Sequence, residues 1–142
     1  MNEPGRILAI DYGEKRVGLA MTDPLAIIAS GFNTIQNNNR KDLIKELLEI
    51  IQSNGVNGVV VGIPYSLDGE SGPMAESVKE FVRELESSVE VKVETWPEEY
   101  SSEDAKSELR KLGVDYRKDK GEVDKMAAAL ILRSYLDHIE KH

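Results

Sequence analysis

The stretch that decides the fold is RILAIDYGEKRVGLAMT, residues 6–22. Its first part, residues 6–12, is a short apolar run closed by a glycine, which predicts a strand buried on both faces of a sheet. A second apolar run, Arg16–Thr22, follows after only a few residues. A third, Ile27–Ile35, comes after an Asp-Pro pair. The close spacing of the three runs predicts consecutive antiparallel strands joined by hairpins.

After residue 38 helices alternate with strands. Asn39–Ser53 has apolar residues at helical spacing, and Val56–Gly62 contains the run Val-Val-Val, which is typical of a central strand. The remaining predicted elements are a helix capped by Ser71 and ending near Ser87, a strand built on Val89, Val91 and Val93, and helices over about Ser101–Leu112 and Glu122–His138. The order βββαβαβαα predicts the α/β class, with a mixed five-stranded sheet and helices on both faces.

Length and composition limit the class of protein. The chain has 142 residues, of which 40% are hydrophobic, so we expect one domain over residues 1–142. The absence of cysteine excludes thiolate zinc sites, redox dithiols and cysteine nucleophiles. No apolar run approaches the roughly 18 residues of a membrane span, and the start lacks the order of a signal peptide. We therefore expect a soluble cytoplasmic protein with no membrane partner.

Acidic residues follow the predicted strands. Asp11 ends the first strand, Glu98 and Glu99 follow the fifth, and Asp124 lies in the first turn of the last predicted helix. Ligands of open sheets bind beyond the carboxyl ends of parallel strands. Carboxylates from separate segments suit Mg²⁺ or Mn²⁺, and one or two such ions support phosphodiester cleavage. Each acid also has a structural alternative, as a turn residue for Asp11 or as a partner of a helix dipole for the others.

Three segments together resemble the YqgF family, also called RuvX. They are ILAIDYGEKRVGLA (7–20), VVGIPYSLDG (60–69) and VDKMAAALIL (123–132), and the similarity runs in order along nearly the whole chain. Members of that family are described as Holliday junction resolvases and as nucleases that mature the 5′ end of pre-16S ribosomal RNA. The resemblance implies a ribonuclease H-like fold and a divalent-metal site built from acids.

The resemblance also implies which acids form that site. Asp11 matches the family's first-strand aspartate, and Asp124 matches the aspartate that opens the last helix. The family usually has Asp-Glu-Arg before a Ser/Thr pair, where this chain has Pro97, Glu98 and Glu99. Aligned on the hydroxyl pair, Glu98 takes the glutamate position, with Glu99 as the register alternative. The implied catalytic and metal-binding residues are therefore Asp11, Glu98 and Asp124.

Other positions suggest contacts with substrate. The net charge of −8 argues on average against nucleic acid, but residues 106–120 hold six basic and three acidic residues, a net of +3 that leaves −11 elsewhere. A solvated hairpin, an ordinary tight turn and a solvated helix face are the structural alternatives for these positions. The candidate substrate-binding residues are Lys15, Arg16, Asp68, Gly69, Arg117, Lys118 and Lys120.

We therefore expect a magnesium-dependent nuclease of structured nucleic acid that processes the 5′ end of pre-16S ribosomal RNA, resolves Holliday junction DNA, or does both. The alternative is a catalytically weak module that binds nucleic acid or a ribosome-assembly partner, which the altered segment at Pro97 motivates. A third hypothesis, actin-like ATP hydrolysis, needs two such domains. The sequence leaves open RNA or DNA, endonuclease or exonuclease, and monomer or homodimer.

Overall fold

Five strands form one mixed sheet in the computed structural model, which describes residues 5–64, 73–98, 102–113 and 120–140. The strand order is β3-β2-β1-β4-β5. β2 pairs antiparallel with both β1 and β3, whereas β4 pairs parallel with both β1 and β5. The predicted order βββαβαβαα is confirmed. The elements are β1 (Arg6–Asp11), β2 (Arg16–Thr22), β3 (Ala29–Gln36), α1 (Arg40–Asn54), β4 (Val56–Pro64), α2 (Pro73–Ser88), β5 (Lys92–Glu98), α3 (Ser102–Lys111) and α4 (Lys120–Glu140).

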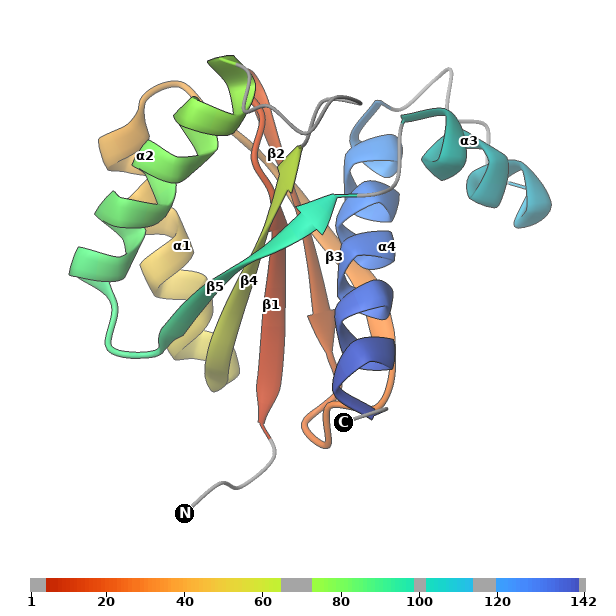
Figure 1. Ribbon diagram of the computed structural model, residues 1–142, viewed down its shortest axis with the longest axis horizontal. Helices are drawn as coiled ribbons and strands as arrows, with labels where there is room; N and C mark the ends of the chain where they lie inside the picture. Colours follow the sequence, from red (N-terminus) through yellow and green to blue (C-terminus); the bar gives the residue numbers. More distant parts are fainter. Residues whose placement is uncertain (1–4, 65–72, 99–101, 114–119, 141–142) are drawn as a thin grey trace.

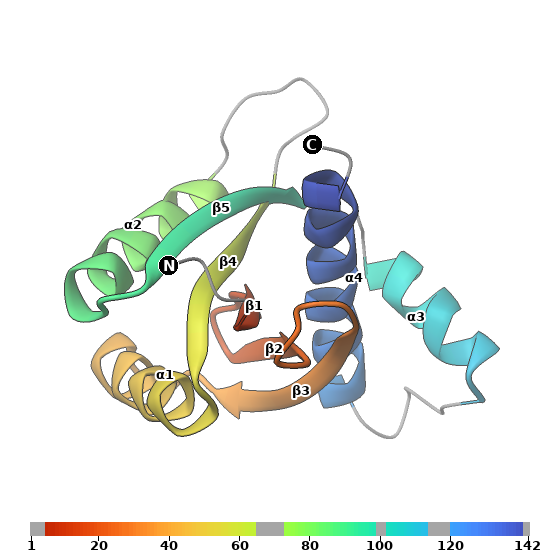
Figure 2. The ribbon, with the colours of Figure 1, turned by 90° about the horizontal axis from the view of Figure 1, so that it is seen from below.

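Helices cover both faces of the sheet, as the sequence predicts (Figure 1). α1 and α2 lie on one face and α4 on the other, with α3 packed against the outer side of α4 (Figure 2). Two buried clusters fill these layers, and β1 contributes to both by strand alternation. Leu8 and Ile10 belong to the α1/α2 cluster, whereas Ala9 belongs to the α4 cluster. Asp11 follows Ala9 by two residues, and residues two apart in a strand share a face, so the place of Asp11 in the strand is on the α4 face.

Helix α1 begins and ends as the sequence predicts. The side chain of Asn39 accepts a hydrogen bond from the backbone N–H of Asp42 at 2.9 Å, which caps the first turn. Gly55 has a φ of 65°, and its N–H donates to the carbonyl of Ile51. This left-handed residue ends the helix, because glycine adopts that conformation without the strain of a Cβ.

The bounds of β3 and β5 differ most from the prediction. β3 begins at Ala29 rather than Ile27, because the Asp23 carboxylate accepts the N–H groups of Ile27 and Ile28 at 2.8 and 2.7 Å and holds them in the β2–β3 loop. β5 covers Lys92–Glu98, so of the three valines on which the strand was predicted it includes Val93 and leaves out Val89 and Val91. Pro97 therefore lies within a strand, which is possible because β5 is an edge strand and one side of it needs no ladder hydrogen bond.

The last helix also differs from the prediction. α4 begins at Lys120 rather than Glu122, so Asp124 falls in its second turn and Glu122 in its first. Because the helix dipole acts mainly on the terminal turn, the dipole explanation of Asp124 loses its support.

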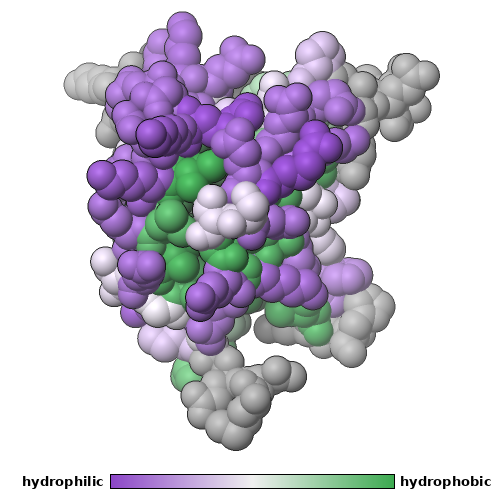
Figure 3. All heavy atoms as spheres, turned by 90° about the vertical axis from the view of Figure 1, so that its left-hand side faces the viewer, coloured by the Kyte–Doolittle hydropathy of each residue, from purple (hydrophilic) through white to green (hydrophobic). Residues whose placement is uncertain are grey.

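The outer surface of the α1/α2 layer is mostly hydrophilic, with a hydrophobic area visible between polar side chains (Figure 3). This pattern agrees with amphipathic helices whose apolar stripes face the sheet, such as Val78, Phe81 and Leu85 of α2. Among the helices in the described ranges, none is both long and apolar enough to cross a membrane.

Candidate active site

The carboxyl end of β1 is anchored on both sides of Asp11. Ile10 is fully buried and Tyr12 is 8% exposed, and both belong to the α1/α2 cluster. The ring of Tyr12 stacks on Phe81 of α2, with centroids 4.4 Å apart and an interplanar angle of 24°. These contacts fix the backbone of Asp11, which is itself half-buried on the α4 face.

Helix α4 approaches β2 closely at Gly18. A Cβ at this position would overlap the carbonyl oxygen of Asp124 and would lie 2.9 Å from the Cβ of Asp124. Gly18 is also the strand partner of Asp11, and paired Cα atoms in an antiparallel ladder lie about 5 Å apart. The missing side chain of Gly18 therefore lets Asp124 lie beside Asp11. The structure brings together these two predicted site residues from opposite ends of the chain.

Two further contacts hold the start of α4 on the sheet. The Thr34 hydroxyl of β3 donates to the carbonyl of Gly121 at 2.7 Å. Gly31 provides a second close approach, since a Cβ there would lie 3.1 Å from the Cβ of Lys125. Sequence reasoning missed these positioning residues. The signal available was the pair of glycines inside predicted strands, which often marks a close approach of another backbone.

Arg16, the first residue of β2, forms an ion pair with Asp124. Its Nε donates to Oδ2 of Asp124 at 2.8 Å, and the two side chains are 35% and 22% exposed. The preceding turn is held by Asn37, whose amide donates to the carbonyl of Gly13 at 2.8 Å and whose N–H donates to the carbonyl of Lys15 at 2.9 Å. Lys15 itself is exposed. The predicted phosphate contact of Arg16 remains a prediction, whereas its pairing with Asp124 is a contact that the sequence did not reveal.

The backbone of Glu98 lies at the same end of the parallel strands as Asp11. Glu98 is the last residue of β5 and pairs with Pro64 of β4. Ile10 pairs with Val61, so Asp11 lies level with the next residue of β4, and Glu98 ends two residues further along. Since neighbouring strands lie about 4.8 Å apart, β5 is displaced from β1 by roughly 10 Å across the sheet.

The third metal ligand stays a prediction, because the side chain of Glu98 and all of Glu99 lie outside the described residues. Within the described ranges no group of three or more histidine, cysteine, aspartate or glutamate residues could hold a metal ion. The chemistry of the two acids nevertheless fits a divalent cation. Asp11 and Asp124 supply hard oxygen donors at a partly exposed edge, and Asp124 already holds the cationic group of Arg16.

The remaining candidates for substrate binding are only partly described. Lys120 is exposed at the first residue of α4. Lys111, in the predicted basic segment, pairs with Glu108 at 3.2 Å. The other predicted substrate-binding residues lie outside the described ranges, and their roles stay predictions. They are Asp68, Gly69, Arg117 and Lys118.

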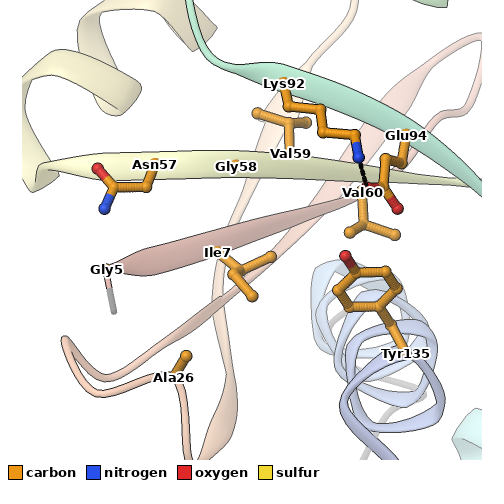
Figure 4. Close-up of a pocket in the computed structure, with 10 residues that line it drawn as sticks. All are labelled: Gly5, Ile7, Ala26, Asn57, Gly58, Val59, Val60, Lys92, Glu94 and Tyr135. Atoms are coloured by element: carbon orange, nitrogen blue, oxygen red, sulfur yellow. Dashed lines mark ion pairs between the residues drawn. The ribbon is translucent and has the colours of Figure 1, made fainter. Parts of the chain in front are cut away.

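A separate pocket of about 250 Å³ lies at the opposite end of the parallel strands (Figure 4). Gly5, Asn57 and Lys92 mark the amino ends of β1, β4 and β5 along its wall. Its acidic group, Glu94, already pairs with Lys92 at 2.8 Å, and Tyr135 of α4 points into the same space. Ligands of such sheets bind at the other end of the strands, so this pocket is not the candidate site.

A mixed five-stranded sheet in the order β3-β2-β1-β4-β5, with helices on both faces, is a ribonuclease H-like fold. Solved structures support this class. RuvC of Thermus thermophilus in complex with a Holliday junction has a TM-score of 0.58 at 15% identity, covering 95% of this chain and 96% of that one. The fowlpox virus resolvase in complex with its junction substrate has a TM-score of 0.62 at 12% identity, covering 94% and 98%. At these identities the similarity concerns the fold.

The chain belongs to the RuvX family, described as "Holliday junction resolvase", whose model matches residues 5–138. Relatives carry the name "Putative pre-16S rRNA nuclease". The one from Syntrophus aciditrophicus is 38% identical over 136 residues, covering 96% of this chain and 91% of its own length. That from Chloroflexus aurantiacus is 40% identical over 131 residues, covering 92% and 86%. The resemblance predicted from three sequence segments is confirmed.

Proposed function

We propose that this protein is a divalent-metal-dependent nuclease that hydrolyses phosphodiester bonds of structured RNA in the cytoplasm and processes the 5′ end of pre-16S ribosomal RNA. The observation that carries the proposal is that the backbone of Asp124 packs against Gly18, the strand partner of Asp11. The name "Putative pre-16S rRNA nuclease", which relatives matched over 91% and 86% of their own length carry, supports pre-16S ribosomal RNA as the substrate.

Asp11, Asp124 and Glu98 are the residues that would hold Mg²⁺ or Mn²⁺. The chemistry that such an ion would supply is activation of an attacking water and stabilisation of the leaving oxygen of a phosphodiester. The protein's part is to fix its acids before substrate arrives. Asp11 is fixed by the buried residues on either side of it, and Asp124 by the contact of its backbone with Gly18. Lys15, exposed on the turn between β1 and β2, would neutralise substrate phosphate.

The test is cleavage of a 5′-extended pre-16S ribosomal RNA fragment by the purified protein with magnesium. We expect Asp11→Asn to lower the rate on the order of a thousandfold while preserving the circular dichroism spectrum. Asp137→Asn is the matched control, because it removes the same charge from an exposed position on α4. Equal activity of Asp11→Asn and the wild type, in preparations free of contaminating nuclease, would refute the proposed site.

Holliday junction DNA is the second candidate substrate, which the description of the family model favours. The same preparations should be offered a four-way DNA junction beside the RNA. If the protein cleaves the junction and not the RNA, its substrate is DNA. The proposed acidic residues would still form the active site. Tight binding of either substrate with no cleavage in any divalent metal would instead support the binding-module hypothesis.

A further inference from the structure

We propose that Arg16 competes with the metal ion for Asp124, and that the guanidinium released by metal binding turns to substrate phosphate. Arg16 would thereby couple metal binding to nucleic-acid binding. The inference rests on the proposed function, since it assumes that Asp124 is a metal ligand.

The geometry of the ion pair between Arg16 and Asp124 allows it to be exchanged. Arg16 donates from Nε to a single carboxylate oxygen of Asp124 at 2.8 Å. A guanidinium has five N–H donors, so this hydrogen bond uses only one of them. The two side chains are 35% and 22% exposed, so solvent and ions reach the pair and screen part of its attraction. The pair is therefore easily exchanged for another pairing of the same charges.

Helix α4 does not depend on this ion pair for its position. Asp124 is held against β2 through the contact of its backbone with Gly18, and the start of α4 is tied to β3 by the hydrogen bond from Thr34 to Gly121. Loss of the hydrogen bond from Arg16 leaves both contacts intact. The carboxylate of Asp124 can therefore change partner while its backbone stays in place.

The location of Arg16 also favours a contact with substrate. Arg16 is the first residue of β2 and directly follows the turn that carries the exposed Lys15. This start of β2 lies at the same end of the sheet as Asp11, the last residue of β1. A cation arriving at Asp124 repels the guanidinium and satisfies the charge that held it. Arg16 then has donors available beside Lys15, where substrate phosphates would lie. Coupling of this kind is reciprocal, so nucleic acid should also strengthen metal binding.

The test begins with calorimetric titration of Mn²⁺ into the protein without nucleic acid. Arg16→Gln should bind Mn²⁺ about fivefold more tightly than the wild type, because the competing cation is gone. Lys15→Gln removes the same charge from the neighbouring residue and should change the affinity by less than about twofold. Arg16→Lys keeps a cation near Asp124 and should bind Mn²⁺ with an affinity close to that of the wild type.

The second readout is the affinity for a short 5′-extended pre-16S RNA probe, measured by fluorescence anisotropy with Ca²⁺ or with a chelator. In the wild type Ca²⁺ should strengthen binding, and in Arg16→Gln most of this gain should disappear. Equal or weaker Mn²⁺ binding by Arg16→Gln, or an unchanged effect of Ca²⁺ on its RNA affinity, would overturn the inference. A wild type that binds no divalent metal would instead refute the proposed function, so the two failures are distinguishable.

Discussion

The Nε atom of Arg16 lies 2.8 Å from Oδ2 of Asp124, and this ion pair joins the first residue of β2 to the second turn of α4. It lies next to the contact at Gly18, which makes Asp124 a neighbour of Asp11. The site therefore depends on how closely one helix approaches one strand. That dependence allows the packing and the chemistry to be tested separately.

Gly18→Ala should damage both stability and activity. The new methyl group would overlap the backbone of Asp124, so α4 must move outward, at a cost of about 1–3 kcal/mol in the free energy of unfolding. The shift should also lower the rate of RNA cleavage by on the order of a hundredfold, because catalytic groups tolerate little displacement. Urea unfolding and cleavage rates at saturating magnesium measure the two effects.

Gly58→Ala is the control for this substitution. Its added Cβ would have no atom within 4 Å, and the position lies in β4 near the start of the strand. We expect a change below about 0.5 kcal/mol in unfolding free energy and no change in cleavage rate. Equal losses in the two variants would mean that the contact at Gly18 does not position the site.

Asp23 should make the stability of the β2–β3 loop depend on pH. The N–H of Ile28 donates to its carboxylate at 2.7 Å, and this hydrogen bond, with those from Ile27 and Leu25, lowers the pKa of Asp23. The unfolded chain then binds the proton more readily than the folded protein. The stabilisation is therefore present above the ordinary pKa of aspartate and is lost as the pH falls through the lowered pKa.

The measurement is the unfolding free energy of the wild type and Asp23→Asn as a function of pH. The wild type should be the more stable at neutral pH, and the difference should narrow as the solution is acidified through that range. A difference that stays constant with pH would show that the hydrogen bonds to Asp23 do not favour its ionised form.

Tyr135 should make the stability of the protein fall as the pH rises into the alkaline range. Burial raises the pKa of its hydroxyl, and the negative charge of Glu94 raises it further. The folded protein thus holds the proton more firmly than the unfolded chain, so this contribution to stability is complete below the ordinary tyrosine pKa. It is lost as the pH rises through the raised value. Ultraviolet titration of tyrosinate should show that Tyr135→Phe removes a late-ionising group, and an unchanged titration curve in this variant would contradict the assignment.

Much of the fold follows from local pattern. The apolar run Arg16–Thr22 matches β2 from end to end, and Asn39 and Gly55 mark the two ends of α1 because capping depends on chemistry within one turn. β5 was predictable in this way only in part, since Val93 is the one residue of the predicted valine series that lies in the strand. Val89 and Val91 alternate like a strand but pack against the core outside the sheet, because the register with β4 selects Lys92–Glu98 instead.

The site was predictable only in part. The ends of strands and the family resemblance indicated Asp11 and Asp124. Their proximity depends on the absence of a side chain at Gly18, and strand alternation gives no information about what lies above a glycine. The ion pair of Arg16 with Asp124 spans 108 positions along the chain, so no local pattern reveals it. Glu98 has a defined place in the backbone of β5, and its role as a ligand remains a prediction.

The central claim is that Asp11 and Asp124 act as one metal-dependent site, and a double-mutant comparison tests it most directly. Single-turnover cleavage of the pre-16S RNA fragment should be measured for Asp11→Asn, Asp124→Asn and the double variant. Residues that act as a unit lose their effect together, so each single variant should fall by on the order of a thousandfold and the double variant should fall no further. Independent losses that multiply in the double variant, or a single variant with wild-type rate, would contradict the claim.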